Sequence, residues 1–286
     1  MNFKKNLKRL IPDRFMLKYS YNRVFKKRLD LKNPKVFNEK LQWLKLYDRK
    51  DVYTTMVDKY EVKNYVANII GEEYIIPTLG IYKRWEDINF DVLPNQFVIK
   101  CTHDSGGIVI VKDKNVLDLK KAKEKITKSL KRNFYYIGRE WPYKNVEPRI
   151  IIEKYLIDSN NSMRDYKFFC FNGKPEIMYI SEGLENHETA SMSFFDMDFN
   201  LTNCKRSDYK ELGYMPEKPQ TFEKMKEFAS VLSKGIPHLR VDFYEIDGHL
   251  YFGELTFFTN SGYIPFEDEK WNLKLGEMID LSKVRK

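Results

Sequence analysis

Apolar and polar side chains alternate along residues 240–244 and 251–256, which is the pattern of β-strands that bury one face. The dipeptide Asp247-Gly248 separates the two runs and is a strong turn signal, so the pattern predicts a β-hairpin. We expect its buried face to carry Val241, Phe243, Tyr251, Gly253 and Leu255. The opposite face is expected to carry Arg240, Asp242, Tyr244, Phe252, Glu254 and Thr256.

The type of turn decides whether Asp242 and Glu254 share a face. A two-residue type I′ turn would put the two acids on opposite faces. A type I turn with Gly248 as a G1 bulge would pair Glu245 with His249, and the acids would become diagonal neighbours roughly 7–8 Å apart. We favour the bulged turn, because it also gathers the apolar side chains on one face. Two carboxylates at this spacing predict a Mg²⁺ site, with an amphipathic hairpin and solvated acids as the alternative.

The rest of the chain reads as a mixture of helices and strands. Apolar residues at helical spacing predict helices over 36–50, 51–70, 117–133 and 219–235. Short runs rich in β-branched and aromatic residues predict strands over 96–100, 108–112, 147–156, 163–173, 174–181 and 190–199. Asn172-Gly173 marks a turn between two of these strands. Strands joined by hairpins, with helices in separate blocks, indicate an α+β fold with antiparallel sheets.

Composition indicates a globular protein. The chain has 286 residues, of which 42% are hydrophobic, enough for one large domain or two smaller ones. Its three cysteines, Cys101, Cys170 and Cys204, lack a C-x-x-C spacing, which argues against a disulfide framework or a zinc site and favours a reducing compartment. No apolar run approaches the ~18–20 residues of a membrane span, and no signal-peptide pattern is present. We therefore expect a cytoplasmic protein.

The net charge of +9 is concentrated near the N-terminus. The basic residues of the first 28 positions are Lys4, Lys5, Lys8, Arg9, Arg14, Lys18, Arg23, Lys26, Lys27 and Arg28. Apolar residues are interleaved with them, so this basic, partly amphipathic segment can make peripheral contact with an anionic membrane or an acidic polymer. A solvated helix face is the alternative. Nucleic acid is the weakest candidate partner, because no binding motif accompanies the charge.

Three lysines and a loop are candidates for phosphate binding. Lys100 ends a buried strand shortly before the loop Ser105-Gly106-Gly107, whose backbone N–H groups can cradle phosphate oxygens. Lys59 and Lys63 are expected one helical turn apart on the same helix face. An ordinary hairpin turn and surface lysines would explain the same residues equally well.

Two later strands add further candidates. The strand at 150–156 ends in a charged and aromatic junction, Glu153 to Leu156, which can offer backbone groups and an apolar wall to a purine. Lys167 on the next strand can add positive charge. Taken singly, each of these lysines, the loop and the 153–156 segment is more simply explained by a structural role than by nucleotide binding. Their order along the chain is what points to a nucleotide-binding protein.

This order resembles the ATP-grasp superfamily, and within it the TupA-like branch found in bacterial polysaccharide and teichuronopeptide gene clusters. The resemblance runs through NPKVFNEKLQWLKLYDRK, DKYEVKNYV, FVIKCTHDSGG, IIIEKYL, DYKFFCFNGKP and VDFYEIDGHLYFGELTF. It implies an ATP-grasp fold, in which two α+β subdomains clamp ATP. The implied segments are a basic helical region at 1–75, a small subdomain with the glycine-rich loop at 76–152, and a large subdomain with the metal-binding hairpin at 153–286.

The resemblance also implies roles for single residues. Those implied to bind ATP are Lys59 and Lys100 at the phosphates, His103, Ser105, Gly106 and Gly107 in the covering loop, Glu153, Lys154, Tyr155 and Leu156 at adenine and ribose, and Lys167 as added positive charge. Asp242 and Glu254 are implied to bind Mg²⁺. Many ATP-grasp enzymes have Glu-x-Asn at the second acid, whereas this chain has Thr256 in place of the asparagine. Thr256, Asn260 or water would then complete the coordination.

The implied reaction joins a carboxylate to an amine. Attack of the carboxylate on the γ-phosphate of ATP gives an acyl phosphate, from which the amine displaces phosphate. The transferring charge would be neutralised by Lys59, Lys100, Lys167 and Mg²⁺ on the acid pair, and Arg240 would hold the substrate carboxylate. We expect small-molecule or sugar-nucleotide substrates that supply a uronic acid or amino acid constituent of a bacterial surface polysaccharide such as a capsule.

Two other classes of protein stay open. A glycosyltransferase of polysaccharide biosynthesis would use Asp196-Met197-Asp198 as a D-x-D metal motif, but this leaves Lys59, Lys100 and the small-residue loop unexplained. A non-catalytic scaffold would bind a polymer or a membrane through its basic N-terminus. Carboxylate-dependent release of phosphate from ATP distinguishes a ligase from both.

Overall fold

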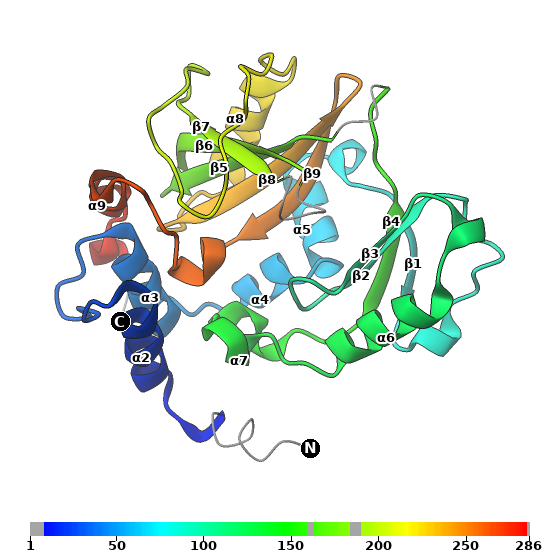
Figure 1. Ribbon diagram of the computed structural model, residues 1–286, viewed down its shortest axis with the longest axis horizontal. Coiled ribbons are helices and arrows are strands. Elements are labelled where there is room, and N and C mark those ends of the chain that lie inside the picture. Colours follow the sequence, from blue (N-terminus) through cyan, green and yellow to red (C-terminus); the bar gives the residue numbers. More distant parts are fainter. Residues whose placement is uncertain (1–8, 160–162, 184–189, 285–286) are drawn as a thin grey trace. The chain divides into compact units, whose positions relative to one another are not determined.

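The computed structural model describes residues 9–159, 163–183 and 190–284 (Figure 1). The chain forms two compact units, one of Met1–Arg49 with Ser162–Lys286 and the other of Lys50–Asn161. Each unit holds its own antiparallel sheet together with helices, so the predicted α+β class is confirmed. The units divide the chain at other points than the expected segments 1–75, 76–152 and 153–286, which stay predictions.

The sheet of the Lys50–Asn161 unit has four strands in the order β1-β4-β2-β3. The strands are β1 (Thr78–Tyr82), β2 (Phe97–Cys101), β3 (Ile108–Val111) and β4 (Ile150–Lys154). One face buries Phe97, Ile99 and Ile152 against Ile126 of α6 (Leu119–Leu130), because alternate strand residues point to the same side. Three of these strands and α6 correspond to predicted elements, whereas β1 was not expected after Pro77.

The predicted single helix over 51–70 is wrong, because the chain forms α4 (Val52–Val57) and α5 (Glu61–Ile70). Asp58 ends α4 in an extended conformation, and its Oδ1 accepts a hydrogen bond from the backbone N–H of Tyr60 at 2.9 Å. This side chain bond favours a turn over continued helix. Lys59 therefore lies in the turn between the helices and not one helical turn from Lys63.

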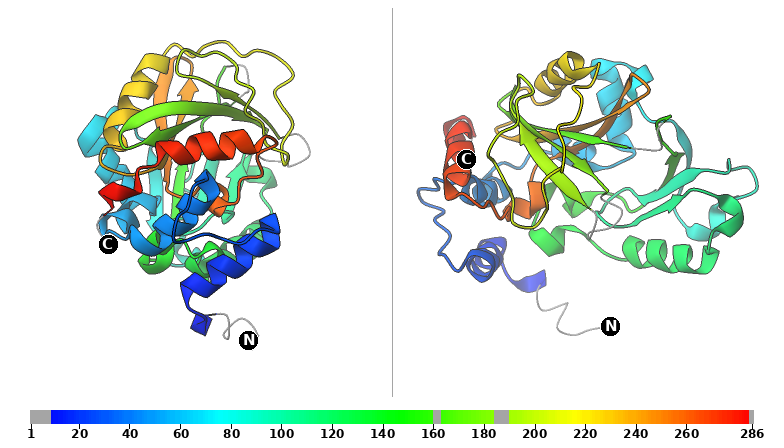
Figure 2. Two further views of the ribbon diagram at one scale, coloured as in Figure 1. Left: turned by 90° about the vertical axis from the view of Figure 1, so that its left-hand side faces the viewer. Right: turned by 45° about the horizontal axis from the view of Figure 1, so that its top comes forward.

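The sheet of the other unit has five strands in the order β7-β6-β5-β8-β9. The strands are β5 (Asp165–Phe171), β6 (Lys174–Glu182), β7 (Ser191–Phe195), β8 (Leu239–Ile246) and β9 (His249–Thr256). The predicted turn at Asn172-Gly173 is confirmed between β5 and β6, with both residues at positive φ. One face packs against α8 (Phe222–Leu232), which runs across the strands (Figure 2). The ring centroids of Phe222 and Phe168 are 5.9 Å apart.

The same unit contains α2 (Asp13–Phe25), α3 (Phe37–Tyr47) and α9 (Glu269–Met278). Phe37 stacks on Phe169 of β5 with ring centroids 5.8 Å apart, so α3 covers one end of the sheet face that α8 leaves open. The remaining short helices are α7 (Tyr135–Gly138) and the 3₁₀ turns Glu72–Tyr74, Trp85–Asp87, Lys114–Val116, Trp141–Asn145, Thr259–Gly262 and Leu281–Lys283. Among the described helices, none has both the length and the apolar character needed to cross a bilayer.

Candidate functional site

The turn between β8 and β9 differs from the prediction. Ile246 pairs with His249, and both intervening residues lie at positive φ, 49° for Asp247 and 76° for Gly248. This is a two-residue turn of the type I′ class, because that class needs positive φ at both central positions. The predicted G1 bulge, with Glu245 opposite His249, is therefore wrong.

A bulge further along the hairpin brings the two acids to one face. Phe243 pairs with Phe252 but Asp242 pairs with Glu254, so Gly253 is the extra residue on β9. A Cβ at Gly253 would lie 3.0 Å from the Asp242 carbonyl oxygen, which explains why glycine fits here. The acids are thus directly opposite each other rather than diagonal.

The bulge also exchanges two aromatic side chains relative to the prediction. Tyr251 pairs with Tyr244 on the charged face, whereas Phe252 is buried opposite Phe243. The expected assignment was the reverse, because it placed the bulge at the turn. The charged face therefore carries Tyr244 and Tyr251 as a cross-strand pair on the same hairpin as the two acids.

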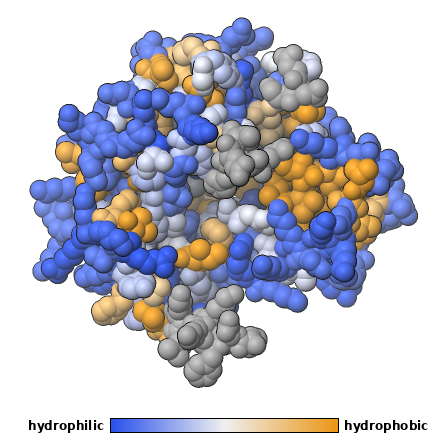
Figure 3. All heavy atoms as spheres, in the orientation of Figure 1, coloured by the Kyte–Doolittle hydropathy of each residue, from blue (hydrophilic) through white to orange (hydrophobic). Residues whose placement is uncertain are grey.

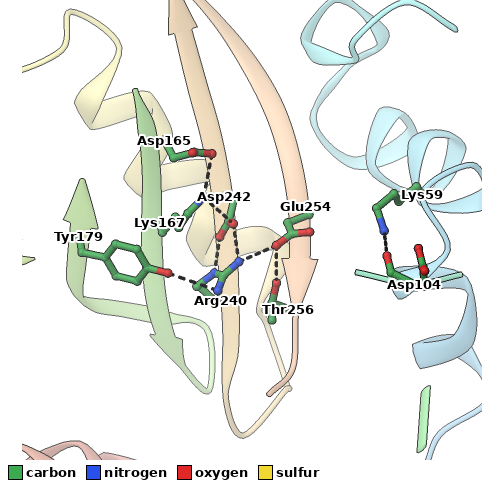
Figure 4. Close-up of polar contacts among 9 residues, drawn as sticks. All are labelled: Lys59, Asp104, Asp165, Lys167, Tyr179, Arg240, Asp242, Glu254 and Thr256. Atoms are coloured by element: carbon green, nitrogen blue, oxygen red, sulfur yellow. Dashed lines mark hydrogen bonds and ion pairs between the residues drawn. The ribbon is translucent and has the colours of Figure 1, made fainter. Parts of the chain in front are cut away.

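Four polar side chains form one row across four strands: Tyr179 of β6, Lys167 of β5, Asp242 of β8 and Glu254 of β9 (Figure 4). The Nζ of Lys167 lies 3.3 Å from Oδ2 of Asp242 and 2.7 Å from Oδ1 of Asp165, two positions earlier on its own strand. Burial by itself would lower the pKa of Lys167, but Asp165 and Asp242 raise it above its ordinary value. Lys167 is therefore a fixed positive charge.

Arg240 lies one row away and joins the two acids. Its Nε and Nη2 donate to Oδ1 and Oδ2 of Asp242 at 2.7 and 2.6 Å, and Nη2 also donates to Oε1 of Glu254 at 2.5 Å. Its Nη1 lies 3.3 Å from the hydroxyl of Tyr179. Burial opposes the charged form, but Asp242 and Tyr179 hold the pKa of Arg240 well above its ordinary value. This buried guanidinium is an ionised partner for both carboxylates.

The two further metal candidates lie in different surroundings. Thr256 faces Arg240 across the hairpin, and its hydroxyl donates to Oε1 of Glu254 at 3.0 Å. Asn260 is exposed at positive φ, and its Nδ2 donates to the carbonyl oxygen of Tyr263 at 2.9 Å. Thr256 is thus in contact with the acid pair, whereas Asn260 caps its own turn.

The donor chemistry of this face fits Mg²⁺. Within residues 9–159, 163–183 and 190–284, no three or more His, Cys, Asp or Glu side chains gather as a metal cage. Mg²⁺ is commonly held by only one or two carboxylates, together with water and substrate phosphates. Asp242 and Glu254 place two hard oxygen donors side by side, each bound to Arg240, and their role as metal ligands stays a prediction.

The other unit carries a second polar cluster around the expected phosphate loop. The Nζ of Lys59 donates a hydrogen bond to the backbone oxygen of Asp104 (Figure 4). Its backbone N–H donates to the Thr102 carbonyl oxygen at 3.1 Å. Ser105 and Gly106 are exposed, with Gly106 at a φ of 100°. Lys59 is therefore attached to the loop at both its backbone and its side chain.

Buried side chains anchor the base of this loop. Asp104 is 1% exposed, and its Oδ2 accepts hydrogen bonds from the hydroxyl of Ser129 and, at 2.6 Å, from Nη2 of Arg132. The Nε2 of His103 lies 2.9 Å from the Arg132 carbonyl oxygen, so this nitrogen is the donor. A Cβ at Gly107 would meet the Ser129 hydroxyl at 2.4 Å. His103 and Gly107 thus hold the loop, while Ser105 and Gly106 face solvent.

Glu153 joins two of the candidate lysines. Its Oε1 lies 2.5 Å from Nζ of Lys63, and its Oε2 lies 2.7 Å from Nζ of Lys100. Burial by itself would raise the pKa of Glu153, but the two lysines outweigh it and lower the pKa to about 2. The three residues form an ion triad on β2, β4 and α5.

The residues after Glu153 differ in exposure. Lys154 is exposed, and its backbone N–H donates to the Pro77 carbonyl oxygen at 3.0 Å. Tyr155 is half-buried and Leu156 is 7% exposed. The expected role of this segment at adenine and ribose stays a prediction.

Sequence reasoning missed several members of both clusters: Asp165, Tyr179, Asp104, Ser129 and Arg132. A signal for Asp165 was present, because it lies two positions before Lys167 on the same strand and therefore on the same face. The contact between Asp104 and Ser129 joins residues 25 positions apart and has no local signature.

Comparison with known proteins gives a family match and similar solved structures. The model of the TupA-like ATP-grasp family matches residues 39–280. A search of the curated proteins finds no match. The D-alanine–D-alanine ligase of Helicobacter pylori is similar in structure, with a TM-score of 0.50 and 17% identity over 85% of this chain and 69% of that one. The D-alanine–D-alanine ligase of Bacillus anthracis has a TM-score of 0.42 and 18% identity over 79% of this chain and 66% of that one.

The fold and the family match place this protein among the ATP-grasp proteins, whose enzymes are ATP-dependent carboxylate–amine ligases. Because the family model matches most of its length, the chain belongs to the TupA-like ATP-grasp family.

Proposed function

We propose that this protein is an ATP-dependent ligase that joins a carboxylate to an amine through an acyl phosphate. The observation that carries the proposal is the pair Asp242 and Glu254, directly opposite on β8 and β9 and bound to Arg240. Two acids with two adjacent buried cations suit a site that binds anionic phosphates together with a divalent ion. Family membership gives the same expectation.

The proposed reaction has two steps. One oxygen of the substrate carboxylate attacks the γ-phosphorus of ATP, and ADP leaves. The amine nitrogen then attacks the acyl carbon, phosphate leaves with that oxygen, and the nitrogen loses a proton. When bound, Mg²⁺ on Asp242 and Glu254 would neutralise phosphate charge. Thr256 would orient Glu254 through the hydrogen bond that its hydroxyl donates.

The cations of the chain take the remaining roles. Lys167 and Arg240 offset negative charge on the reacting groups. The guanidinium of Arg240 binds Asp242 with two parallel hydrogen bonds and also binds Glu254, so it orients the two acids and does not hold the substrate carboxylate as expected. Lys59 holds the loop that would cover the phosphates. Lys100, oriented by Glu153, supplies a further ammonium group.

We further propose that the carboxylate or the amine belongs to a uronic acid or amino acid constituent of a bacterial surface polysaccharide, such as a capsule. The support is the family resemblance. A cytoplasmic location fits ATP as substrate and the three buried free cysteines.

Isotope transfer tests the chemistry directly. The purified protein would be incubated with ATP, Mg²⁺, an amine and candidate uronic or amino acids labelled with ¹⁸O in the carboxylate. An acyl phosphate predicts ADP formation that depends on the acid and one ¹⁸O atom in the released phosphate. Release of unlabelled phosphate alone would contradict the proposal.

Three variants separate the ligase from the glycosyltransferase. D242N and E254Q should abolish turnover, because each removes a ligand charge. D196N is the control: the Asp196 carboxylate accepts hydrogen bonds from the backbone N–H groups of Asp198 and Asn200, at 3.0 and 2.8 Å, as an ordinary turn does. Turnover of a sugar nucleotide that is lost in D196N and kept in D242N would favour the glycosyltransferase.

A further inference from the structure

Helix α2 has two apolar stripes on different faces. Leu17 and Tyr21 are 1% and 3% exposed and pack inward, where the ring of Tyr21 meets that of Phe25. Phe15 and Tyr19 are 66% and 62% exposed. Residues four apart share a helix face, so each pair forms its own stripe. The inward stripe packs into the fold, whereas the outer stripe is mostly exposed.

Two more exposed apolar residues come directly before the helix. Leu10 is 80% exposed and Ile11 is 38% exposed, and both precede Asp13, the first residue of α2. In Figure 3 apolar spheres lie over α2 beside the blue spheres of charged residues. Exposed apolar residues scattered singly are normal, but four of them within ten positions make a patch. We call Leu10, Ile11, Phe15 and Tyr19 the outer stripe.

The segment that carries the outer stripe is rich in basic side chains. Residues 9–28 contain seven basic side chains and one acidic side chain. The acidic one, Asp13, is bound to Arg49 at 2.8 Å. Arg14 and Arg23 on α2 and Lys26 directly after it are exposed. The expected basic residues Lys4, Lys5 and Lys8 lie outside the described residues.

We propose that the outer stripe of α2 and its basic border dock this protein on an anionic lipid bilayer. Aromatic and aliphatic side chains enter the boundary between headgroups and acyl chains, while arginine and lysine pair with anionic headgroups. A second copy of the chain fits less well, because it would bring two basic borders together. An acidic polymer would satisfy the charges but would leave the outer stripe exposed. No residue of the outer stripe is among those assigned to the reaction.

Co-sedimentation of the full chain with vesicles tests the proposal. The vesicles would be phosphatidylcholine alone or with about one third phosphatidylglycerol. We expect binding to the anionic vesicles only, weakening as salt is raised. The double variant F15A/Y19A should bind roughly tenfold more weakly, because it removes apolar area from the docked face. R14E/R23E should bind at least roughly a hundredfold more weakly, because it reverses two charges at the surface.

The control is L201A/M215A, which removes two other side chains of the same unit that are 55% and 56% exposed. It should bind vesicles as the unaltered chain does. Equal binding of F15A/Y19A and the unaltered chain would overturn the proposal, as would the absence of vesicle binding. Binding to dextran sulfate that is unaffected by F15A/Y19A, without vesicle binding, would identify an acidic polymer instead. A concentration-dependent dimer lost in F15A/Y19A would identify a second copy.

Discussion

Arg240 binds Asp242 with two parallel hydrogen bonds of 2.7 and 2.6 Å, although the residues are only two positions apart on the same strand. These two hydrogen bonds are possible because alternate residues of β8 point to the same face of the sheet, where the guanidinium lies beside the carboxylate. Both side chains are buried, so each depends on the other to offset its lost hydration. The pair is therefore part of the fold as well as of the proposed site.

Replacing Arg240 should destabilise the protein strongly. R240M keeps much of the side-chain volume but leaves Asp242 with only the 3.3 Å contact to Lys167 as a countercharge. Loss of one partner of a buried ion pair costs about 3–5 kcal/mol in the free energy of unfolding. Urea unfolding followed by circular dichroism would measure the loss.

The double variant R240M/D242N tests the cause. Because D242N removes the uncompensated charge, the double variant should be more stable than the sum of the two single losses predicts. Strictly additive losses would show that the two side chains stabilise the fold independently. R84M is the surface control, because Arg84 pairs with Asp87 in solvent.

The bulge at Gly253 should not tolerate a side chain. In G253A the new Cβ would meet the Asp242 carbonyl oxygen and a ring carbon of Tyr244, both at 3.0 Å. We expect a loss of roughly 1–3 kcal/mol in stability, because the neighbouring strand must shift. Thermal unfolding compares it with G213A, where nothing lies within 4 Å of the added Cβ. Equal stability of the two variants would contradict the close approach.

The hairpin illustrates what local sequence can and cannot predict. Alternation and Asp247-Gly248 correctly predict two paired strands, because both signals lie within a few residues. The position of the bulge is different: Gly248 and Gly253 both permit one, and each choice brings Asp242 and Glu254 to the same face. The contact between the Asp242 backbone and Gly253 decides between them, and it exists only once the strands have paired.

The break at Asp58 has the same kind of cause. Helical periodicity continues across residues 51–70, so the pattern predicts one helix. The Asp58 carboxylate instead binds the next turn and Arg149, which lies 91 positions away at 2.6 Å. Such distant ion pairs leave no periodic signal. The candidate lysines could therefore be chosen from the sequence, while the pairing of Lys63 and Lys100 with Glu153 could not be predicted.

The loop at 103–107 should loosen when its anchor is removed. In S129A the Asp104 carboxylate loses a buried hydroxyl donor and keeps Arg132. One buried hydrogen bond is worth about 1 kcal/mol, so loop amides should exchange hydrogen roughly five- to tenfold faster. Hydrogen exchange followed by mass spectrometry would measure this on peptides that cover the loop.

S105A provides the matched control for the loop. Ser105 is exposed in the same segment, so removing its hydroxyl should leave exchange unchanged. If S129A exchanges at the rate of the unaltered chain, the Ser129 hydroxyl does not anchor the loop.

The ion triad of Glu153, Lys63 and Lys100 should make stability depend on pH in the acid range. The folded protein lowers the pKa of Glu153 from 4.5 to about 2, so the folded state binds this proton less readily than the unfolded chain does. The ionised carboxylate therefore adds stability above about pH 4.5, and this contribution falls as the pH drops toward 2. A displacement of this size corresponds to roughly 3 kcal/mol.

E153Q should remove that contribution and leave two partly buried ammonium groups facing each other. Near neutral pH the variant should be less stable than the unaltered chain by roughly 3 kcal/mol, and the difference should shrink steadily as the pH is lowered below about 4.5. Urea unfolding at a series of pH values would measure it. E147Q is the control, because Glu147 meets Lys83 at the exposed surface, 2.9 Å away, and salt screens such a pair. A stability difference for E153Q that stays constant from neutral to acid pH would mean that the amide disturbs packing and that the charge of Glu153 is not what stabilises the triad.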